Sequence, residues 1–247
     1  MNETLTVGDL VYTIRRSDRR KTVGITIDRD GSLVLHAPTG CRRATIESIG
    51  RQKSLWVHTK LAKREMLFRP THEREFVSGE SFYYLGRSHR LLLLKPGECG
   101  EDTPALRLHE GRFKLRRDKI AQGRDIFQRW YMRHGQVWIE RRAALLAPRI
   151  TAEPKAIKVR DLGYRWASCG HGGNLSFHWC AICLPPAIIE YLVAHELIHL
   201  IQPHHNNDFW SRMERVMPDY DRRKRWLAEK GGRYAFAPPE NQPARGR

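Results

Sequence analysis

Hydrophobic positions along the first half of the chain follow two spacings, one typical of strands and one typical of helices. Apolar residues recur at every second position in Val23, Ile25 and Ile27, and an apolar run over 33–35 follows Asp30-Gly31. Asp-Gly is a favoured tight-turn pair, so the two segments predict a hairpin joined at 29–31. Helical spacing follows over 45–67. Strand patterns return over 76–94 and, as a second hairpin across Glu110-Gly111, over 106–115.

The second half of the chain is dominated by helical patterns. Apolar residues at helical spacing run over 119–146, and Pro148 predicts the end of that helix. Strands are expected near 157–162 and 174–180. A further helix begins at Pro185-Pro186, where a missing N–H costs nothing, and runs to about Gln202. Two shorter helices, separated at Pro218-Asp219, complete the pattern.

The composition is that of a globular protein. Of the 247 residues, 40% are hydrophobic and 9% aromatic, which argues against disorder. The longest apolar stretch, 187–200, is interrupted by Glu190, His195 and Glu196, so we expect no membrane span. The N-terminus lacks the basic start and apolar run of a secretory signal, which predicts a cytoplasmic location. Five scattered cysteines are then expected to be reduced thiols.

The charge is the strongest anomaly of the composition. Lys and Arg number 44 against 27 Asp and Glu, a formal net charge of +17. Such a charge favours an acidic partner, which would be nucleic acid, a nucleotide or an acidic protein surface. The alternative is a solvated basic surface that keeps the protein soluble, since charge alone identifies no partner.

The segment His195-Glu196-Leu197-Ile198-His199 lies within the apolar helix that begins at Pro185-Pro186. Histidines four residues apart project from one helix face, so both imidazoles can bind one ion at about 2.0–2.1 Å. Glu196 can reach a water molecule at an open metal position and take its proton. Burying these groups in an apolar helix is costly unless a metal binds them. We therefore predict one zinc ion, with His195 and His199 as ligands and Glu196 as the catalytic base.

A catalytic zinc needs a third protein ligand. Pro203 ends the helix, and a chain that turns back there can bring His204 or His205 to the metal. Asp208 is an alternative, either as a ligand or as an acceptor for a histidine N–H. The spacing by itself does not choose between His204 and His205.

The residues around this site resemble the YgjP-like metallopeptidases, relatives of the SprT-like zinc peptidases. The family pattern is HExxH, five residues, His, three residues and Phe-Trp, and His205 and Phe209-Trp210 fit it while His204 does not. Further matches are Pro218-Asp219-Tyr220, Trp226-Leu227, Arg165-Trp166-Ala167-Ser168-Cys169, Gly173-Asn174-Leu175-Ser176, Gly79-Glu80 and Tyr84-Leu85-Gly86. The resemblance spans 11–227 and implies a zinc peptidase with His205 as the third ligand.

These features together predict an α+β fold. It has a β-rich N-terminal half, a long connecting helix, and a zincin-like C-terminal half with a small antiparallel sheet and the HExxH helix. We expect a β-rich region with one helix over 1–118, the metallopeptidase domain over 119–232, and a flexible tail over 233–247.

Three further positions are candidates for contacts with a protein or peptide substrate. Trp166 and Ser168 lie in a segment expected to form or adjoin an edge strand, to which a peptide can add through backbone hydrogen bonds. The alternative for Trp166 is that it fills the core. Tyr220, or an arginine of 222–225, is a candidate for stabilising an oxyanion.

The cysteines raise the question of a second metal. Cys169, His171, Cys180 and Cys183 have a spacing that permits a structural zinc site. Because only one Cys-x-x-Cys pair exists, we favour buried free cysteines that behave as small apolar residues.

Two other functions compete with that of a peptidase. A zinc-activated water beside arginines could attack a nucleoside triphosphate, which would make the chain a pyrophosphohydrolase. A nucleic-acid-binding protein with a structural zinc is the third hypothesis. Glu196 argues against it, because a closed structural site needs no base beside its first ligand.

Overall fold

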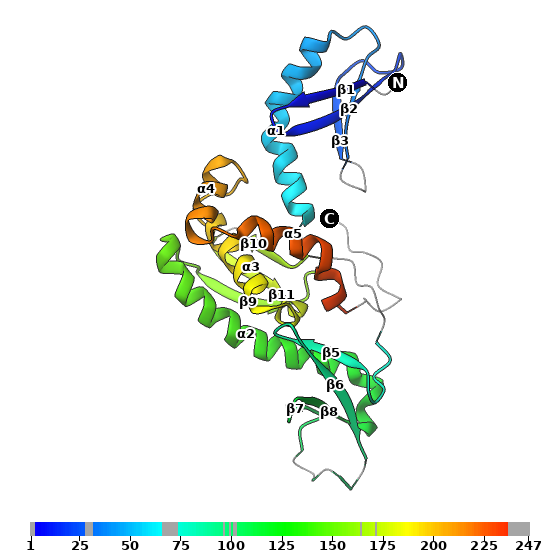
Figure 1. Ribbon diagram of the computed structural model, residues 1–247, viewed down its shortest axis with the longest axis vertical. Coiled ribbons are helices and arrows are strands. Elements are labelled where there is room, and N and C mark those ends of the chain that lie inside the picture. The colour runs from blue at the N-terminus through cyan, green and yellow to red at the C-terminus, as the bar shows by residue number, and fades with distance from the viewer. Residues whose placement is uncertain are drawn as a thin grey trace. The chain divides into compact units, whose positions relative to one another are not determined.

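The computed structural model (Figure 1) describes residues 3–27, 32–65, 74–95, 97–98, 100, 103–163, 165–170 and 172–236. The chain has an α+β fold with three small mixed sheets and five α-helices in this part. It divides into two compact units, Met1–Arg64 with His204–Asn207, and Glu65–Pro203 with Asp208–Arg247. The regions predicted from the sequence, with a boundary between 118 and 119, stay a prediction.

The N-terminal sheet has the strand order β1-β2-β4-β3. Its strands are β1 (Glu3–Val7), β2 (Leu10–Arg16), β3 (Gly24–Ile27) and β4 (Leu33–Ala37), and helix α1 (Arg43–Glu65) follows. Tyr12, Leu35, Ile46 and Val57 are fully buried between the sheet and α1. The expected hairpin is confirmed in its strands, because β3 and β4 pair antiparallel. Its turn at 29–31 lies outside the described residues.

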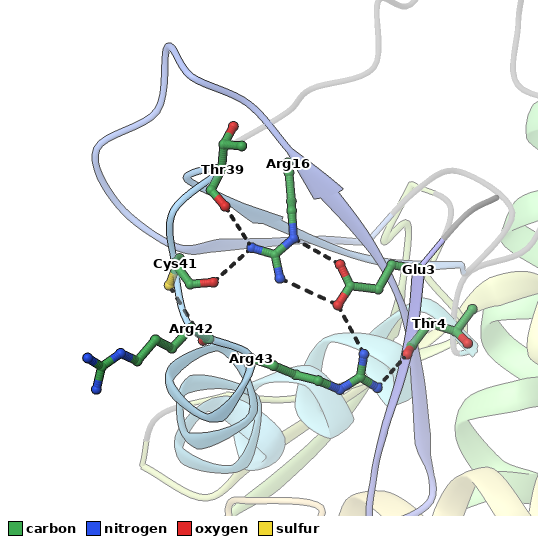
Figure 2. Close-up of polar contacts among 7 residues, drawn as sticks. All are labelled: Glu3, Thr4, Arg16, Thr39, Cys41, Arg42 and Arg43. Atoms are coloured by element: carbon green, nitrogen blue, oxygen red, sulfur yellow. Dashed lines mark hydrogen bonds and ion pairs between the residues drawn. The ribbon is translucent and has the colours of Figure 1, made fainter.

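An arginine cluster holds the start of this unit together (Figure 2). The Arg16 guanidinium donates to the Glu3 carboxylate (Nε to Oε2, 2.9 Å) and to the carbonyl oxygen of Cys41 (2.8 Å). Arg43 donates to the same carboxylate at 3.0 Å and to the carbonyl of Thr4 at 2.9 Å. The hydrogen bond from Arg16 is the main cause that lowers the pKa of Glu3. These two arginines therefore link β1, β2 and the start of α1.

The second sheet repeats the strand order of the first. It is formed by β5 (Ser81–Tyr84), β6 (Arg87–Leu94), β7 (Leu106–His109) and β8 (Arg112–Arg116) in the order β5-β6-β8-β7. In each sheet two antiparallel hairpins join through a central parallel pair, β2 with β4 and β6 with β8. The second sheet leads through η1 (Arg117–Gln122) into α2 (Gly123–Ile150). Phe82 stacks on Phe127 of α2 with ring centroids 4.2 Å apart, so one sheet face packs on this helix.

The third sheet lies next to helix α3 (Pro186–His199) and corrects the prediction of a purely antiparallel sheet. It has the order β10-β11-β9, from β9 (Ala156–Arg160), β10 (Ala167–Gly170) and β11 (Asn174–His178). The neighbours β10 and β11 pair antiparallel, whereas β9 runs parallel to β11. The sheet is mixed because the hairpin partner β10 occupies one side of β11 and leaves the other side for β9. The expected edge strand near Trp166 is β10.

Helix α3 (Pro186–His199) lies at the centre of the unit and bears the candidate metal ligands. It follows η2 (Trp179–Cys183), and ten of its 14 residues are buried. A helix that is apolar on all sides has to be enclosed by other elements. It contacts α2, β10 and α5 (Tyr220–Lys230), while α4 (Asn207–Val216) and η3 (Gly231–Tyr234) complete the unit. The two predicted short helices, separated at Pro218-Asp219, are thus confirmed as α4 and α5.

The turn between β5 and β6 fixes the segment from which α3 starts. The amides of Leu85 and Gly86 donate to the carbonyls of Ile182 and Cys183 at 2.9 and 3.1 Å. Gly86 has a φ of +76°, and a Cβ on it would lie 2.8 Å from Pro185 Cα. Only glycine allows this approach, so this turn helps to set the position of the helix.

Two predicted ends differ from the structure. Pro148 lies inside α2, which continues to Ile150 and ends at Thr151 in the left-handed region. So late in a helix a proline removes one hydrogen bond only, and buried Ile150 extends the packed face. The predicted flexible tail begins with folded residues, because Ala235 and Phe236 are buried, and 237–247 lie outside the described residues. Among the described helices, none has the length and apolar character needed to cross a membrane.

Candidate metal centre

Three histidines from two segments meet at the C-terminal end of α3. His195 and His199 come from the helix and His205 from the segment after it, and one ring nitrogen of each lies within 4.8 Å of the others. The Nε2 atoms of His195 and His199 are 3.1 Å apart. Nitrogens bound to a tetrahedral zinc at about 2.0–2.1 Å are about 3.4 Å apart, so this spacing suits a common ion. His195 and His205 are 2% and 3% exposed, which screens the group from solvent.

The orientation of His199 is fixed by the backbone. Its Nδ1 lies 3.1 Å from the carbonyl oxygen of Gln202. A carbonyl only accepts hydrogen bonds, so Nδ1 carries the proton and Nε2 presents a lone pair to the cluster. A backbone acceptor on the far nitrogen is the usual support of a metal-binding histidine. Pro203, which ends the helical path, leaves the Gln202 carbonyl available for this role.

Aromatic side chains surround the imidazoles. The ring of buried Phe209 lies 4.9 Å from that of His195 and 4.8 Å from that of His199, centroid to centroid. Tyr191 lies 5.8 Å from His195 on the same helix. The low polarity of these neighbours strengthens electrostatic interactions at the cluster. The Phe209-Trp210 pair of the resemblance therefore has a structural role that spacing alone did not reveal.

Glu196 is 2% exposed and projects from α3 towards β10. Burial raises the pKa of its carboxyl group to about 8, against a smaller lowering by a hydrogen bond from the Cys169 backbone and by Arg165. Its Oε2 has no hydrogen-bond partner within the described residues. A buried carboxylate oxygen without a partner is costly, and a water molecule or cation beside it would relieve that cost. The donor set and this oxygen fit a metal with an attacking water.

The structure distinguishes the two adjacent histidines that the spacing left open. His205 is buried in the cluster, while His204 is exposed and outside it. Asp208 is also exposed, at the start of α4, and does not belong to the group.

The three candidate substrate residues lie in different environments. Trp166 is fully buried and packs against Gly231, with the ring 3.3 Å from where a Cβ of Gly231 would be, so its side chain belongs to the core. Ser168 lies on β10 and accepts from Arg165 Nη1 at 3.3 Å. Tyr220 stacks on Trp210 with centroids 5.3 Å apart, and the Trp210 ring lies 6.3 Å from that of His195. Tyr220 is thereby connected to the cluster through one aromatic ring.

Two of the cysteines, Cys180 and Cys183, are buried as expected, whereas Cys169 on β10 is half-buried. Cys180 and Cys183 are fully buried in η2, and burial raises the pKa of the Cys183 thiol to about 12. Within the residues that the structure describes, the three-histidine cluster is the only potential metal-binding group, and it contains no cysteine. His171, the remaining candidate for a second site, lies outside those residues.

Sequence reasoning missed a contact between buried His178 and half-exposed Asp161 close to the same sheet. His178 Nε2 lies 3.6 Å from Asp161 Oδ1, and Cys180 N donates to His178 Nδ1 at 3.0 Å. The parallel pairing of β9 and β11 brings their ends together, with Arg160 opposite His178. Seventeen positions separate the two residues, so no local pattern identified them.

Comparison with known proteins places the chain in a family. The model of the YgjP-like metallopeptidase domain matches residues 21–230. No curated protein matches the chain. Among solved structures, the metallopeptidase zymogen abylysin of Pyrococcus abyssi is similar at 19% identity, with a TM-score of 0.34, over 38% of this chain and 95% of that one. Because the family model matches most of the chain, this protein belongs to the YgjP-like metallopeptidase family.

Proposed function

We propose that the chain is a zinc-dependent peptidase in which His195, His199 and His205 hold one zinc ion and Glu196 is the general base. The observation that carries this proposal is the convergence of three imidazoles, together with a buried carboxyl group on Glu196, the residue that follows His195 on α3. Soft metals and oxygen-preferring cations fit an all-histidine donor set less well than zinc does. Zinc supplies Lewis acidity and lowers the pKa of a water molecule at its open position.

Glu196 takes the proton from the attacking water and later gives it to the leaving amine. A general base works best when its pKa is near the operating pH, and burial moves the Glu196 pKa upwards from the usual range of a carboxyl group. A bound cation would lower that pKa again, towards neutrality or below. The amide of Cys169 holds the carboxylate from the side of β10 and limits its rotation.

The edge strand β10 is the proposed site for the peptide backbone. It pairs with β11 on one side only within its sheet, and its Cys169 already contacts the base. An extended peptide that adds to this edge would run past Glu196. Ser168 is placed to contact such a peptide. Trp166 is a weaker candidate, because its side chain is buried and its carbonyl already accepts a hydrogen bond from the His178 amide at 2.7 Å. Tyr220, stacked on Trp210, is the candidate donor to the oxyanion.

The test compares wild type with Glu196→Gln on unfolded protein substrates and on nucleoside triphosphates. The amide keeps the shape of the side chain but cannot accept a proton. We expect proteolysis to fall by about 10²–10⁴-fold, with the zinc content unchanged. If wild type hydrolyses triphosphates but not proteins, and Glu196→Gln loses that hydrolysis, the chain is a pyrophosphohydrolase and not a peptidase. A protein that retains zinc and hydrolyses neither would support a structural zinc.

A further inference from the structure

The face of the second sheet that points away from α2 carries an arginine cluster. Leu91, Phe113 and Leu115 are buried on the inner face, so the residues between them in β6 and β8 point outwards. Register places Arg90 opposite Arg112, and Lys114 opposite Arg107 of β7. The outward positions on these three strands are Ser88, Arg90, Leu92, Arg107, His109, Arg112, Lys114 and Arg116, while Leu94 at the end of β6 lies on the same face but is buried. This face is therefore predominantly cationic.

The acidic residues nearby compensate only part of this charge. Lys114 pairs with Glu110 (Nζ to Oε2, 2.9 Å), and Arg116 pairs with Asp118 at 2.9 Å. No described carboxylate forms an ion pair with Arg90, Arg107 or Arg112, in contrast to Arg16 and Arg43 of the N-terminal cluster (Figure 2). The Nε of Arg107 is buried without a hydrogen-bond partner among the described residues.

This arrangement costs stability in the isolated chain. Like charges directly opposite each other on neighbouring strands repel, and the face contains two such pairs, Arg90 with Arg112 and Arg107 with Lys114. A buried donor without a partner adds to the cost. An anion bound across the strands would remove both penalties. Neighbouring strands lie about 4.8 Å apart, so the three arginines extend over about 10 Å and can meet more than one anionic group.

We propose that Arg90, Arg107 and Arg112 form a binding site for the phosphate backbone of nucleic acid. Arginine binds phosphate oxygens through two parallel N–H groups, and nucleic-acid interfaces are polar and strongly basic. A protein partner would need an apolar or aromatic centre, whereas partly buried Leu92 is the main apolar side chain among these arginines. The formal net charge of +17 also favours an anionic partner such as nucleic acid. This site is independent of the metal centre and of the proposed peptidase activity.

The test measures binding of fluorescent 20-mer DNA, single-stranded and duplex, to the full chain over a range of salt concentrations. The variant is the triple substitution Arg90→Gln, Arg107→Gln and Arg112→Gln. The matched control removes the same charge from exposed positions of the N-terminal unit by Arg19→Gln, Arg20→Gln and Lys21→Gln. For duplex we expect the site variant to bind about 100-fold more weakly near 0.1 M salt, with a slope of log K against log salt that is smaller by about 2–3.

A second measurement separates loss of binding from loss of folding. In the absence of DNA, the site variant should have the same thermal midpoint as wild type or a higher one, because the repelling arginines have been removed. Equal weakening of DNA binding in the control would overturn the proposal, because binding would then follow total charge alone. Tighter binding of polyglutamate than of DNA, lost in the site variant, would also overturn it in favour of an acidic protein partner.

Discussion

At the scale of single residues, the two neighbouring histidines His204 and His205 offer a matched comparison. Only His205 belongs to the cluster with His195 and His199, so His205→Ala should weaken zinc affinity by at least about 100-fold. His204→Ala removes an exposed imidazole and should leave zinc affinity unchanged. Competition with a chromophoric chelator measures both affinities. Loss of affinity in both variants would contradict the assignment of the third ligand.

Asp161 provides a prediction on pH dependence. The hydrogen bond to His178 lowers the pKa of Asp161 to about 2, below its unfolded value of about 4. A lowered folded pKa stabilises the protein above the unfolded pKa, and this stability is lost as pH falls from about 4 to about 2. The carboxylate is half-exposed, so we expect a loss of about 1 kcal/mol at most.

Chemical denaturation of wild type and Asp161→Asn between pH 2 and pH 6 measures this contribution. The variant should be less stable than wild type at pH 5–6, and the difference should shrink towards pH 2. Glu229→Gln, which changes the charge equally at an exposed position, should show no such convergence. A constant difference between Asp161→Asn and wild type across the range would show that His178 does not hold the carboxylate.

Sequence at this scale identified donors but not their surroundings. HExxH and the downstream His205 suffice to name a cluster, because helical periodicity puts two imidazoles on one face. The acceptor for His199 is a backbone carbonyl, and backbone groups carry no sequence signal beyond the proline that ends the helix. Cys169 contacts Glu196 across β10 and α3, which depends on tertiary packing. The metal ligands were thus predictable from the sequence, while the groups that orient His199 and Glu196 were not.

At the scale of elements, local hairpins were predictable and their assembly was not. The pairings of β3 with β4 and of β7 with β8 follow from short turns between alternating segments. The parallel pairs β2–β4, β6–β8 and β9–β11 join strands that are distant in sequence, so periodicity cannot assign them. These parallel pairs determine which side chains share a sheet face. The pairing of β6 with β8, for example, places Arg90 opposite Arg112.

The short helix η2 yields a prediction about the cysteines. Cys180 and Cys183 have no exposed surface, and their thiol pKa values are raised by burial, so the reactive thiolate is scarce. We expect iodoacetamide at pH 7.5 to modify half-buried Cys41 at least about 10-fold faster than either of them. Peptide mass spectrometry of samples taken at successive times measures the alkylation rate of each cysteine.

A chelator tests whether these thiols are ligands of a metal. EDTA should leave the alkylation of Cys180 and Cys183 slow, because packing protects them, and denaturant should expose both. Rapid alkylation of this pair on chelation, in a chain that stays folded, would instead indicate that the two thiols bind a metal.

At the scale of the whole molecule, metal binding should be coupled to folding. The three histidines converge only when α3 and the segment after it are folded, so the ion binds the folded chain in preference to the unfolded one. With free zinc at about 100 times the dissociation constant, the folded state gains about 2.7 kcal/mol. In a chain of this length that corresponds to a rise of about 5–10 °C in the thermal midpoint of the transition that includes α3.

Thermal unfolding with zinc and with EDTA measures this coupling in wild type, His199→Ala and His204→Ala. Wild type and His204→Ala should lose the full shift on chelation, since both keep the three ligands. His199→Ala should unfold at one temperature in both conditions, because two imidazoles bind zinc too weakly to stabilise the fold. An equal response to EDTA in His199→Ala would place the stabilising ion elsewhere in the chain.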